Sequence, residues 1–262
     1  MPELPDVEIF RRYFQSTSLH QSVEAVTVPS PGLLQGVSAA ELGRKLHDGQ
    51  FVAASRHGKY LFAEVPERGC LVLHFGMTGF LKYHRRKEES PEHAGLIIQF
   101  ENGYRLVFDC QRKFGAISWS ETVKEFLEQK QLGSDPLQKT WDEEGFLEIL
   151  QDRRGSIKSL LMNQQAIAGI GNIYSDEILF QAGIHPRRKV SDLDEKEAHE
   201  LYRRMEAVLQ TAIELRVGEK GWPRDWLLPR RKAGESCPRC GRRIECLDFS
   251  GRHAYCCPQH QT

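Results

Sequence analysis

The pattern of apolar and polar positions divides the chain into a β-rich part and a helical part. Short runs rich in β-branched and aromatic residues alternate with polar positions from residue 23 to about residue 119. Turn signals, such as the Glu-Asn-Gly at 101–103, separate these runs. We therefore expect an antiparallel sandwich or barrel, preceded by one helix over about residues 5–17.

Helical spacing replaces this alternation in the second half of the chain. A helix is expected over 123–131, a break containing Gly and Pro follows at 132–137, and helical periodicity runs from about 142 to 215. The pattern predicts an α+β, multidomain protein with an N-terminal β-sandwich, a leading helix and a C-terminal helical part. The expected boundaries are 1–130 for the β-sandwich domain, 131–141 for a hinge, 142–233 for the helical domain and 234–262 for a cysteine-rich module.

Composition narrows the class of protein without identifying a partner. Hydrophobic residues make up 40% of the 262, which is enough for packed cores, and the formal net charge is +0. The sequence has no apolar run of membrane-spanning length and no signal-peptide pattern, so we expect a cytosolic protein. Positive charge is nevertheless segregated, since 224–243 holds seven Lys and Arg against two acidic residues. Such a run can build a nucleic-acid-binding face, although a solvated surface is the simpler interpretation.

The last 26 residues hold five of the seven cysteines, in a pattern typical of a zinc ribbon. Cys237-Pro-Arg-Cys240 and Cys257-Pro-Gln-His260 are two knuckles of the same form, and 16 residues separate them. Two knuckles on a β-hairpin can present three thiolates and one imidazole to Zn²⁺ in a tetrahedron. We therefore expect one structural zinc ion, whose binding would help to fold a module too small for its own core.

Other ligand choices exist in this module. Cys246, Cys256 and His253 compete with the set above, and Cys256 ranks lower because it would break the two-residue spacing. A module that binds no metal is the remaining alternative. Arginines on the same hairpin, Arg252 among them, could contact phosphates.

Two glycines interrupt the helical part at 168–172. One helix is expected to end near Ala168, Gly169 and Gly171 form the turn, and a new helix begins at Asn172. Free N–H groups at a helix start favour an anion such as phosphate, and Asn172 could cap the helix or reach that phosphate. A tight helix–helix turn without any ligand explains the glycines equally well.

Several segments together resemble one enzyme family. The segments PELPDVE, IKSLLMNQQAIAGIGNIYSDEILFQAGIHP and CPRCG…GRHAYCCPQHQ are similar to formamidopyrimidine-DNA glycosylase and its relative endonuclease VIII. SRHGKYL, LHFGMTG and QRKFGA look like further family signatures, and all occur in the family's order. The resemblance implies a helix–two-turn–helix domain, a zinc-finger β-hairpin and a DNA glycosylase with AP lyase activity that acts on oxidised bases in duplex DNA.

The resemblance also implies four catalytic residues. Removal of the initiator methionine leaves Pro2 with a free secondary amine, which can attack C1′ of a damaged nucleotide and expel the base. The resulting iminium cation acidifies the C2′ proton and permits β-elimination. Glu3 matches the family's proton donor to the sugar ring oxygen, and Lys59 matches a strand lysine near the leaving group. Arg252 matches the finger arginine, which holds a phosphate or assists δ-elimination.

A DNA-binding set follows from the same resemblance. The damaged base must leave the stack before Pro2 can reach its sugar, and Met77, Arg112 and Phe114 match the residues that fill the gap. Ordinary β-domain core is the alternative for Met77 and Phe114. Phosphate contacts are expected at His74, His93, Arg153, Lys158 and Asn172.

The chain also departs from the family. Asp6 replaces a glutamate and His260 replaces a cysteine ligand, while the segment 216–236 is shorter and more basic than the usual loop that caps 8-oxoguanine. Trp222 in this segment could stack on a base or pack under the loop. An endonuclease VIII-like preference for oxidised pyrimidines and a zinc-dependent DNA-binding protein without catalysis are therefore the rival functions. The expected partner is duplex DNA with damaged bases or abasic sites, bound by a monomer in the cytoplasm and at the nucleoid.

Overall fold

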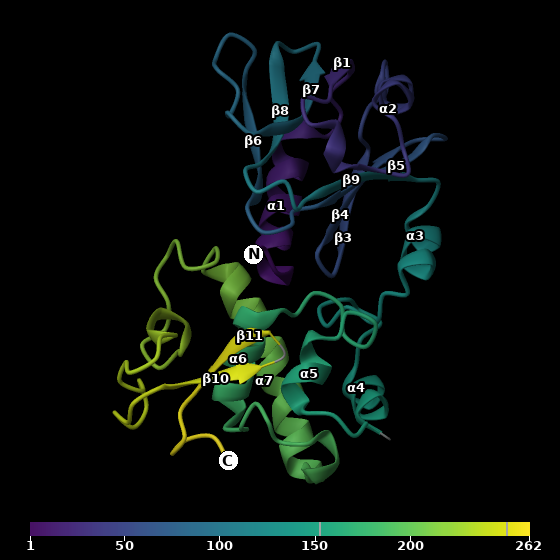
Figure 1. The fold of residues 1–262 in the computed structure, drawn as a ribbon. Helices are drawn as coiled ribbons and strands as arrows, with labels where there is room; N and C mark the ends of the chain where they lie inside the picture. The colour runs from purple at the N-terminus through teal and green to yellow at the C-terminus, as the bar shows by residue number, and fades with distance from the viewer. Residues whose placement is uncertain (152, 250) are drawn as a thin grey trace. The chain divides into compact units, whose positions relative to one another are not determined.

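Figure 1 shows the computed structural model, which describes residues 1–151, 153–249 and 251–262. The chain divides into two compact units, one of residues 1–2 and 6–131 and the other of residues 3–5 and 132–262. The first is a β unit and the second is a helical unit, so the α+β class is confirmed. No helix in the described part of the chain is long and apolar enough to cross a membrane.

The β unit consists of two sheets and three helices. One sheet has the strand order β1-β7-β8-β6 and the other has the order β2-β9-β5-β4-β3. Neighbouring strands are antiparallel except for the β2–β9 pair. The bounds are α1 Leu4–Ser18, β1 Val23–Thr27, β2 Leu34–Gln35, α2 Ala39–Leu46, β3 Ala53–His57, β4 Tyr60–Val65, β5 Gly69–His74, β6 Gly79–Arg85, β7 Ala94–Phe100, β8 Tyr104–Cys110, β9 Ala116–Ser120 and α3 Val123–Lys130.

One apolar core unites the two sheets with α1. Leu61 and Leu73 come from one sheet and Ile98 and Phe108 from the other, while Phe14 is contributed by α1. Alternation places these side chains inward, because successive residues of a strand point to opposite faces. The sandwich inferred from the sequence is confirmed; Cys110 is buried in this core, and Cys70 is buried in a separate small cluster with Phe62, Val72 and Phe126.

Two turns at one end of the β unit are locked together. We call residues 75–79 and 110–115 the paired turns. Arg112 N donates to Thr78 Oγ1 at 3.0 Å, and Gly79 N donates to Phe75 O at 2.8 Å. Gly76 has φ +57°, and a Cβ there would overlap the Phe114 backbone. The turns are therefore rigid platforms for the side chains that they carry.

The described residues of the helical unit form four α-helices and a C-terminal hairpin. Asp194 begins α7 with a complete capping box, and Gly183 ends α6 in the left-handed conformation. Strands β10 and β11 pair antiparallel, with Arg252 opposite Phe249. The bounds are α4 Glu143–Leu150, α5 Ile157–Met162, α6 Asn172–Ala182, α7 Glu195–Glu214, β10 Glu245–Phe249 and β11 Arg252–Cys256.

The expected helix end near Ala168 is wrong, because α5 ends at Met162 and residues 163–171 form turns. Ala166, Ile167 and Ala168 are buried, so their apolar run imitates a helix face. The turn backbone is bonded elsewhere, since Ala168 N donates to Ser134 O at 2.9 Å and Gly169 N to the Gln164 side chain at 3.0 Å. The start of the next helix at Asn172 is confirmed.

Candidate active site and nucleic-acid interface

Glu3 occupies the N-terminus of α6. Its carboxylate accepts hydrogen bonds from the N–H groups of Gly171 at 2.8 Å, Ile173 at 2.9 Å and Tyr174 at 3.1 Å. Glu3 is only 1% exposed, and Leu4 N donates to Gly169 O at 3.0 Å beside it. The first N–H groups of a helix lack partners within the helix and favour negative charge. The turn before α6 and the first residues of this helix therefore hold Glu3 and Leu4 in place.

This arrangement corrects the role inferred for the glycine turn. The anion at the start of α6 is Glu3 rather than a phosphate, and the N-cap residue is Gly171, so Asn172 does not cap the helix. A Cβ on Gly171 would overlap the Glu3 carboxylate, which explains why the position requires glycine. The link joins residues 168 or more positions apart in the sequence, so no local pattern could have revealed it.

Pro2 and Lys59 belong to the β unit. Pro2 is partly exposed, whereas Lys59 is 8% exposed and lies in the turn between β3 and β4. Burial of a lysine argues against an ordinary surface position. His57 beside it is also buried. The predicted role of Lys59 near a leaving group remains a prediction.

The two predicted phosphate-binding histidines differ. Burial, followed by the charges of Lys59 and Lys130, lowers the pKa of His74 to about 4. Its Nδ1 accepts from Gly76 N at 3.3 Å, so a neutral ring can present only Nε2–H to a ligand. His93 is partly exposed, and its backbone N–H donates to Asp109 at 3.0 Å. Asp109 therefore orients the backbone at His93.

Met77, Arg112 and Phe114 lie on the paired turns. Phe114 is 61% exposed and Met77 is 38% exposed, which excludes the core position considered for them. The Arg112 guanidinium lies 5.5 Å from the centre of the Phe114 ring. Large apolar side chains exposed together on rigid turns are typical of binding surfaces. The geometry thus fits an apolar wedge with one cation beside it.

The structure corrects the role predicted for Lys158. The sequence suggested a phosphate contact, but Lys158 is fully buried, with its Nζ 2.5 Å from Asp176 and 2.8 Å from Ser175 Oγ. It lies on the inward face of α5, where its ammonium needs an internal partner and cannot reach DNA. Arg153, by contrast, is exposed and could contact a phosphate.

Asn172 and Arg252 lie on α6 and β11. Asn172 Nδ2 donates to His253 O at 3.0 Å, while its Oδ1 is buried without a hydrogen-bond partner in the described chain. Arg252 is exposed, and with Ser159, Met162 and Asn163 it lines a shallow pocket of about 280 Å³. Among the described residues, its guanidinium donates a hydrogen bond only to the Met162 sulfur, at 3.9 Å. A free cation beside an open pocket suits an anionic ligand.

Three of the four predicted metal ligands lie together. The Sγ atoms of Cys237, Cys240 and Cys257 lie within 4.8 Å of one another. His260 is not in this group, because its Nε2 lies 2.9 Å from Phe180 O and 3.0 Å from Arg239. Cys246 and Cys256 also lie outside the group, which argues against the competing sets. Three converging thiols near a very small apolar cluster fit a structural metal ion.

Sequence reasoning missed Asp176 and Arg231. Asp176 is 1% exposed on α6, and Arg231 bonds to it from the basic segment. The available signal was the adjacent acidic pair Asp176 and Glu177 in a helix whose other residues carry no charge. Trp222 stacks on Trp226, with ring centres 5.3 Å apart, and so packs under its loop.

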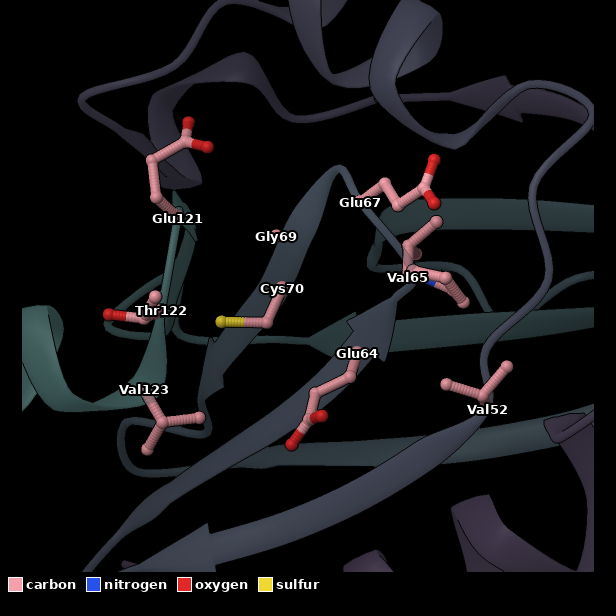
Figure 2. A pocket seen from close by; sticks show the side chains of 10 residues that line it. Val52, Glu64, Val65, Glu67, Gly69, Cys70, Glu121, Thr122 and Val123 are labelled. Atoms are coloured by element: carbon pink, nitrogen blue, oxygen red, sulfur yellow. The ribbon is translucent and has the colours of Figure 1, made fainter.

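A larger cavity of about 680 Å³ lies in the β unit. Figure 2 shows its lining by Val52, Val65 and Val123 together with three carboxylates. None of the predicted catalytic or DNA-binding residues lines it. Its acidic lining is unsuited to DNA phosphates.

Comparisons with known proteins agree along the whole chain. Residues 1–117 match the formamidopyrimidine-DNA glycosylase N-terminal domain, and residues 132–221 match the formamidopyrimidine-DNA glycosylase H2TH domain. The formamidopyrimidine-DNA glycosylase of Pelotomaculum thermopropionicum is 34% identical over 274 residues, covering 100% of this chain and 99% of the relative. That of Lactococcus lactis is 33% identical and covers 98% of each.

Solved structures give the same result. A complex of the Lactococcus lactis Fpg with DNA containing an abasic site has a TM-score of 0.90, at 29% identity over 99% of both chains. A complex of the wild-type Lactococcus lactis Fpg with N7-benzyl-Fapy-dG DNA also has a TM-score of 0.90, at 30% identity over 100% of both chains. With both domains matched in order and relatives aligned over their full length, the chain belongs to the formamidopyrimidine-DNA glycosylase family of base-excision repair enzymes.

Proposed function

We propose that this protein excises oxidised purines from duplex DNA through Pro2 and then nicks the abasic site as an AP lyase. The observation that carries the proposal is the hold on Glu3: three backbone N–H groups fix the residue next to Pro2. A nucleophile must be held in a fixed place to attack efficiently. Because Pro2 is joined to Glu3 by a peptide bond, the same hydrogen bonds also limit the movement of the Pro2 amine.

The chemistry begins once Met1 has been removed. The secondary amine of Pro2 attacks C1′, and the bond from C1′ to the base breaks, with the electron pair leaving on the base. The amine loses its proton as the C–N bond forms, and the sugar ring opens to an iminium ion. Loss of a C2′ proton then expels the 3′ phosphate by β-elimination.

Glu3 supplies proton transfer in this scheme. Its oxygens accept the hydrogen bonds from Gly171, Ile173 and Tyr174, so these bonds hold it as an acceptor. It can take the proton that the Pro2 amine gives up and deliver it to the ring oxygen as the ring opens. General acid–base catalysis of this kind contributes about 10²–10⁴-fold.

The paired turns supply the means to hold an extruded base out of the helix. Phe114 is exposed enough to enter a base stack, and Arg112 beside it can face the unpaired partner base. Arg252 and Asn172 would contact the phosphate next to the lesion. Lys59 would lie near the leaving group, which completes the predicted catalytic set.

A zinc ion fits the three thiols of Cys237, Cys240 and Cys257, and it would stabilise the hairpin that carries Arg252. His260 becomes the fourth ligand if its ring turns away from Phe180 O. Without an ion, the two buried thiols and the exposed Cys240 would leave this part of the chain with only a small core. We therefore assign zinc a structural role only.

Excision of defined lesions tests this function. Duplexes with formamidopyrimidine, 8-oxoguanine or thymine glycol are compared under single-turnover conditions. We expect fastest release of the oxidised purines, in line with the Fapy-dG and abasic DNA named for the related structures. Preferred release of thymine glycol would support the endonuclease VIII-like rival, and binding without any release would support the inactive DNA-binding protein.

A further inference from the structure

Helix α6 holds a buried carboxylate that the proposed chemistry does not use. Asp176 is 1% exposed and accepts from Lys158 Nζ at 2.5 Å, from Arg231 at 2.7 Å and from the Tyr255 N–H at 3.2 Å. An isolated buried carboxylate would be strongly destabilising, and these three donors compensate for its burial. We call Lys158, Asp176 and Arg231 the Asp176 cluster.

The two cations of the cluster differ in what they join. Lys158 is fully buried, and the hydrogen bonds of its ammonium within the described chain go to α6, including Asn172 O at 3.2 Å; its only contact with the hairpin among the described residues is the Phe249 ring, whose centre lies 5.9 Å away. Arg231 comes from the short basic segment and is 18% exposed. Its guanidinium donates to Asn172 O at 3.3 Å and to His253 O at 3.5 Å. It also lies 4.7 Å from the centre of the Tyr255 ring.

These contacts hold one short stretch of β11. His253 O accepts from Asn172 Nδ2 and from Arg231, and Tyr255 N donates to Asp176. The residues bonded on β11 are therefore the first and third after Arg252. Because Arg252 is exposed and makes no ion pair within the described chain, its place depends on the backbone to which it is attached.

We propose that Arg231 and Asp176 are positioning residues that hold β11 so that Arg252 reaches a DNA phosphate. The short basic segment 216–236 then acts as a strap, because its Arg231 links α6 to β11 of the hairpin. This inference rests on the proposed function, because it assigns Arg252 a phosphate. It requires no contact between Arg231 and DNA.

The salt dependence of DNA binding tests the proposal. Affinity for a duplex with a tetrahydrofuran abasic analogue is measured from 50 to 300 mM salt for the full chain loaded with zinc. Each lost phosphate contact lowers the slope of log K against log salt by about 1. We expect Arg252→Gln and Arg231→Met each to lower the slope by about 1, and the double variant to lower it by about 1 in total. Affinity should fall roughly 10- to 100-fold in each case.

Arg230→Met is the matched control, because Arg230 is an exposed neighbour of equal charge. Any effect of this variant should add to that of Arg252→Gln, since among the described residues Arg230 makes no hydrogen bond or ion pair with β11. Hydrogen exchange supplies a second readout: the Tyr255 amide should lose protection in Asp176→Asn if that variant folds, and in Arg231→Met.

The outcomes separate the two hypotheses. A slope lowered by about 2 in the double variant means that Arg231 binds phosphate itself, and an unchanged slope in Arg231→Met means that it positions nothing; either result overturns the inference. Failure of the wild type to release any base would instead contradict the proposed function, while the slopes would still report on the strap.

Discussion

Apolar side chains are usually buried and charged side chains usually exposed. The paired turns of the β unit depart from this rule by exposing apolar residues, and the region around the start of α6 in the helical unit departs from it by burying charged residues. The β unit exposes Phe114 and Met77, whereas the helical unit buries Glu3, Lys158 and Asp176. The exposed part of an apolar side chain adds no hydrophobic stabilisation on folding. A buried charge must recover, through hydrogen bonds or ion pairs, the hydration that it loses. Phe114 is contacted by the Arg112 guanidinium but stays mostly exposed, while the buried charges of the second set are hydrogen-bonded.

This difference distinguishes residues that can contact DNA from residues that position them. Side chains on the paired turns are available to an external ligand, and their backbone is rigid. Buried charges of the helical unit cannot touch DNA, but they fix the backbone of residues that can. We therefore expect substitutions on the turns to affect binding without affecting folding, and substitutions around α6 to affect both.

Blocking the terminal amine should have the largest effect. A variant that retains one residue ahead of Pro2 has no secondary amine, so base excision should fall by at least about 10³-fold. Single-turnover release of 8-oxoguanine measures the loss. DNA affinity should stay within about threefold of the processed protein, and undiminished excision would remove Pro2 from the mechanism.

Gly171→Ala should come next, since a Cβ there would overlap the Glu3 carboxylate. Displacement of Glu3 removes its proton transfer, so we expect excision to fall by about 10²–10⁴-fold. Gly155→Ala is the control, because its Cβ would meet no atom within 4 Å. Equal excision by the two variants would show that the hold on Glu3 is unimportant.

Loss of the metal site should weaken DNA binding strongly. Cys240→Ser removes one of the three clustered thiols, and we expect zinc content to fall from about one ion per chain to near zero. Affinity for abasic DNA should drop about 100-fold as the hairpin loses its order. Cys246→Ser, an exposed cysteine outside the cluster, should retain the ion. Metal analysis with a binding titration distinguishes the two, and full zinc retention in Cys240→Ser would contradict this ligand set.

Two carboxylates give the units opposite responses to pH. Burial would raise the pKa of Glu8 in the β unit, but hydrogen bonds from Arg11 and Arg12 and the charges of Arg11 and Arg56 lower it to about 2. Its contribution to stability is lost as pH falls below about 4.5. Burial raises the pKa of Glu177 on α6 to about 7, although bonds from Gln181 and Leu228 oppose this.

The Glu177 carboxyl should therefore destabilise the folded state as pH rises. Its folded pKa exceeds the ordinary 4.5, so the folded protein binds more protons between about pH 4.5 and 7, and the free energy of unfolding falls across that window by a few kcal/mol. Glu177→Gln should flatten this dependence. Urea unfolding at pH 5 and pH 8 gives the comparison, and an unchanged pH dependence in the variant would argue against the assignment.

Phe114→Ala should have the smallest effect on folding but a clear one on binding. Phe114 is 61% exposed, so its loss should change the free energy of unfolding by less than about 0.5 kcal/mol. Loss of stacking should weaken binding to abasic DNA by about 1–3 kcal/mol. Val52→Ala, another exposed apolar residue of the same unit, should change neither quantity. Equal affinities of the two variants would mean that Phe114 does not enter DNA.

The sequence allowed prediction where the pattern is local. Alternating runs predicted the sandwich, Asn172 began its helix as expected, and the cysteine spacing indicated the thiols that meet. Prediction failed where contacts with segments distant in the sequence determine the local structure. The turn backbone after Met162 bonds to residues 133–134, which no helical pattern records.

Burial of charge was the other obstacle to prediction. Lys158 looks like any surface lysine in the sequence, and only Asp176, 18 positions later, makes its burial possible. Arg231 lies 55 positions beyond Asp176, in a segment that reads simply as basic. Such pairs depend on tertiary packing, so residue type and spacing could not identify them.

Borohydride reduction of the protein mixed with an abasic duplex tests the central mechanism most directly. We expect a covalent protein–DNA adduct, and peptide mass spectrometry should place the modification on the N-terminal Pro2. Absence of an adduct, or an adduct on Lys59 with Pro2 unmodified, would contradict the account.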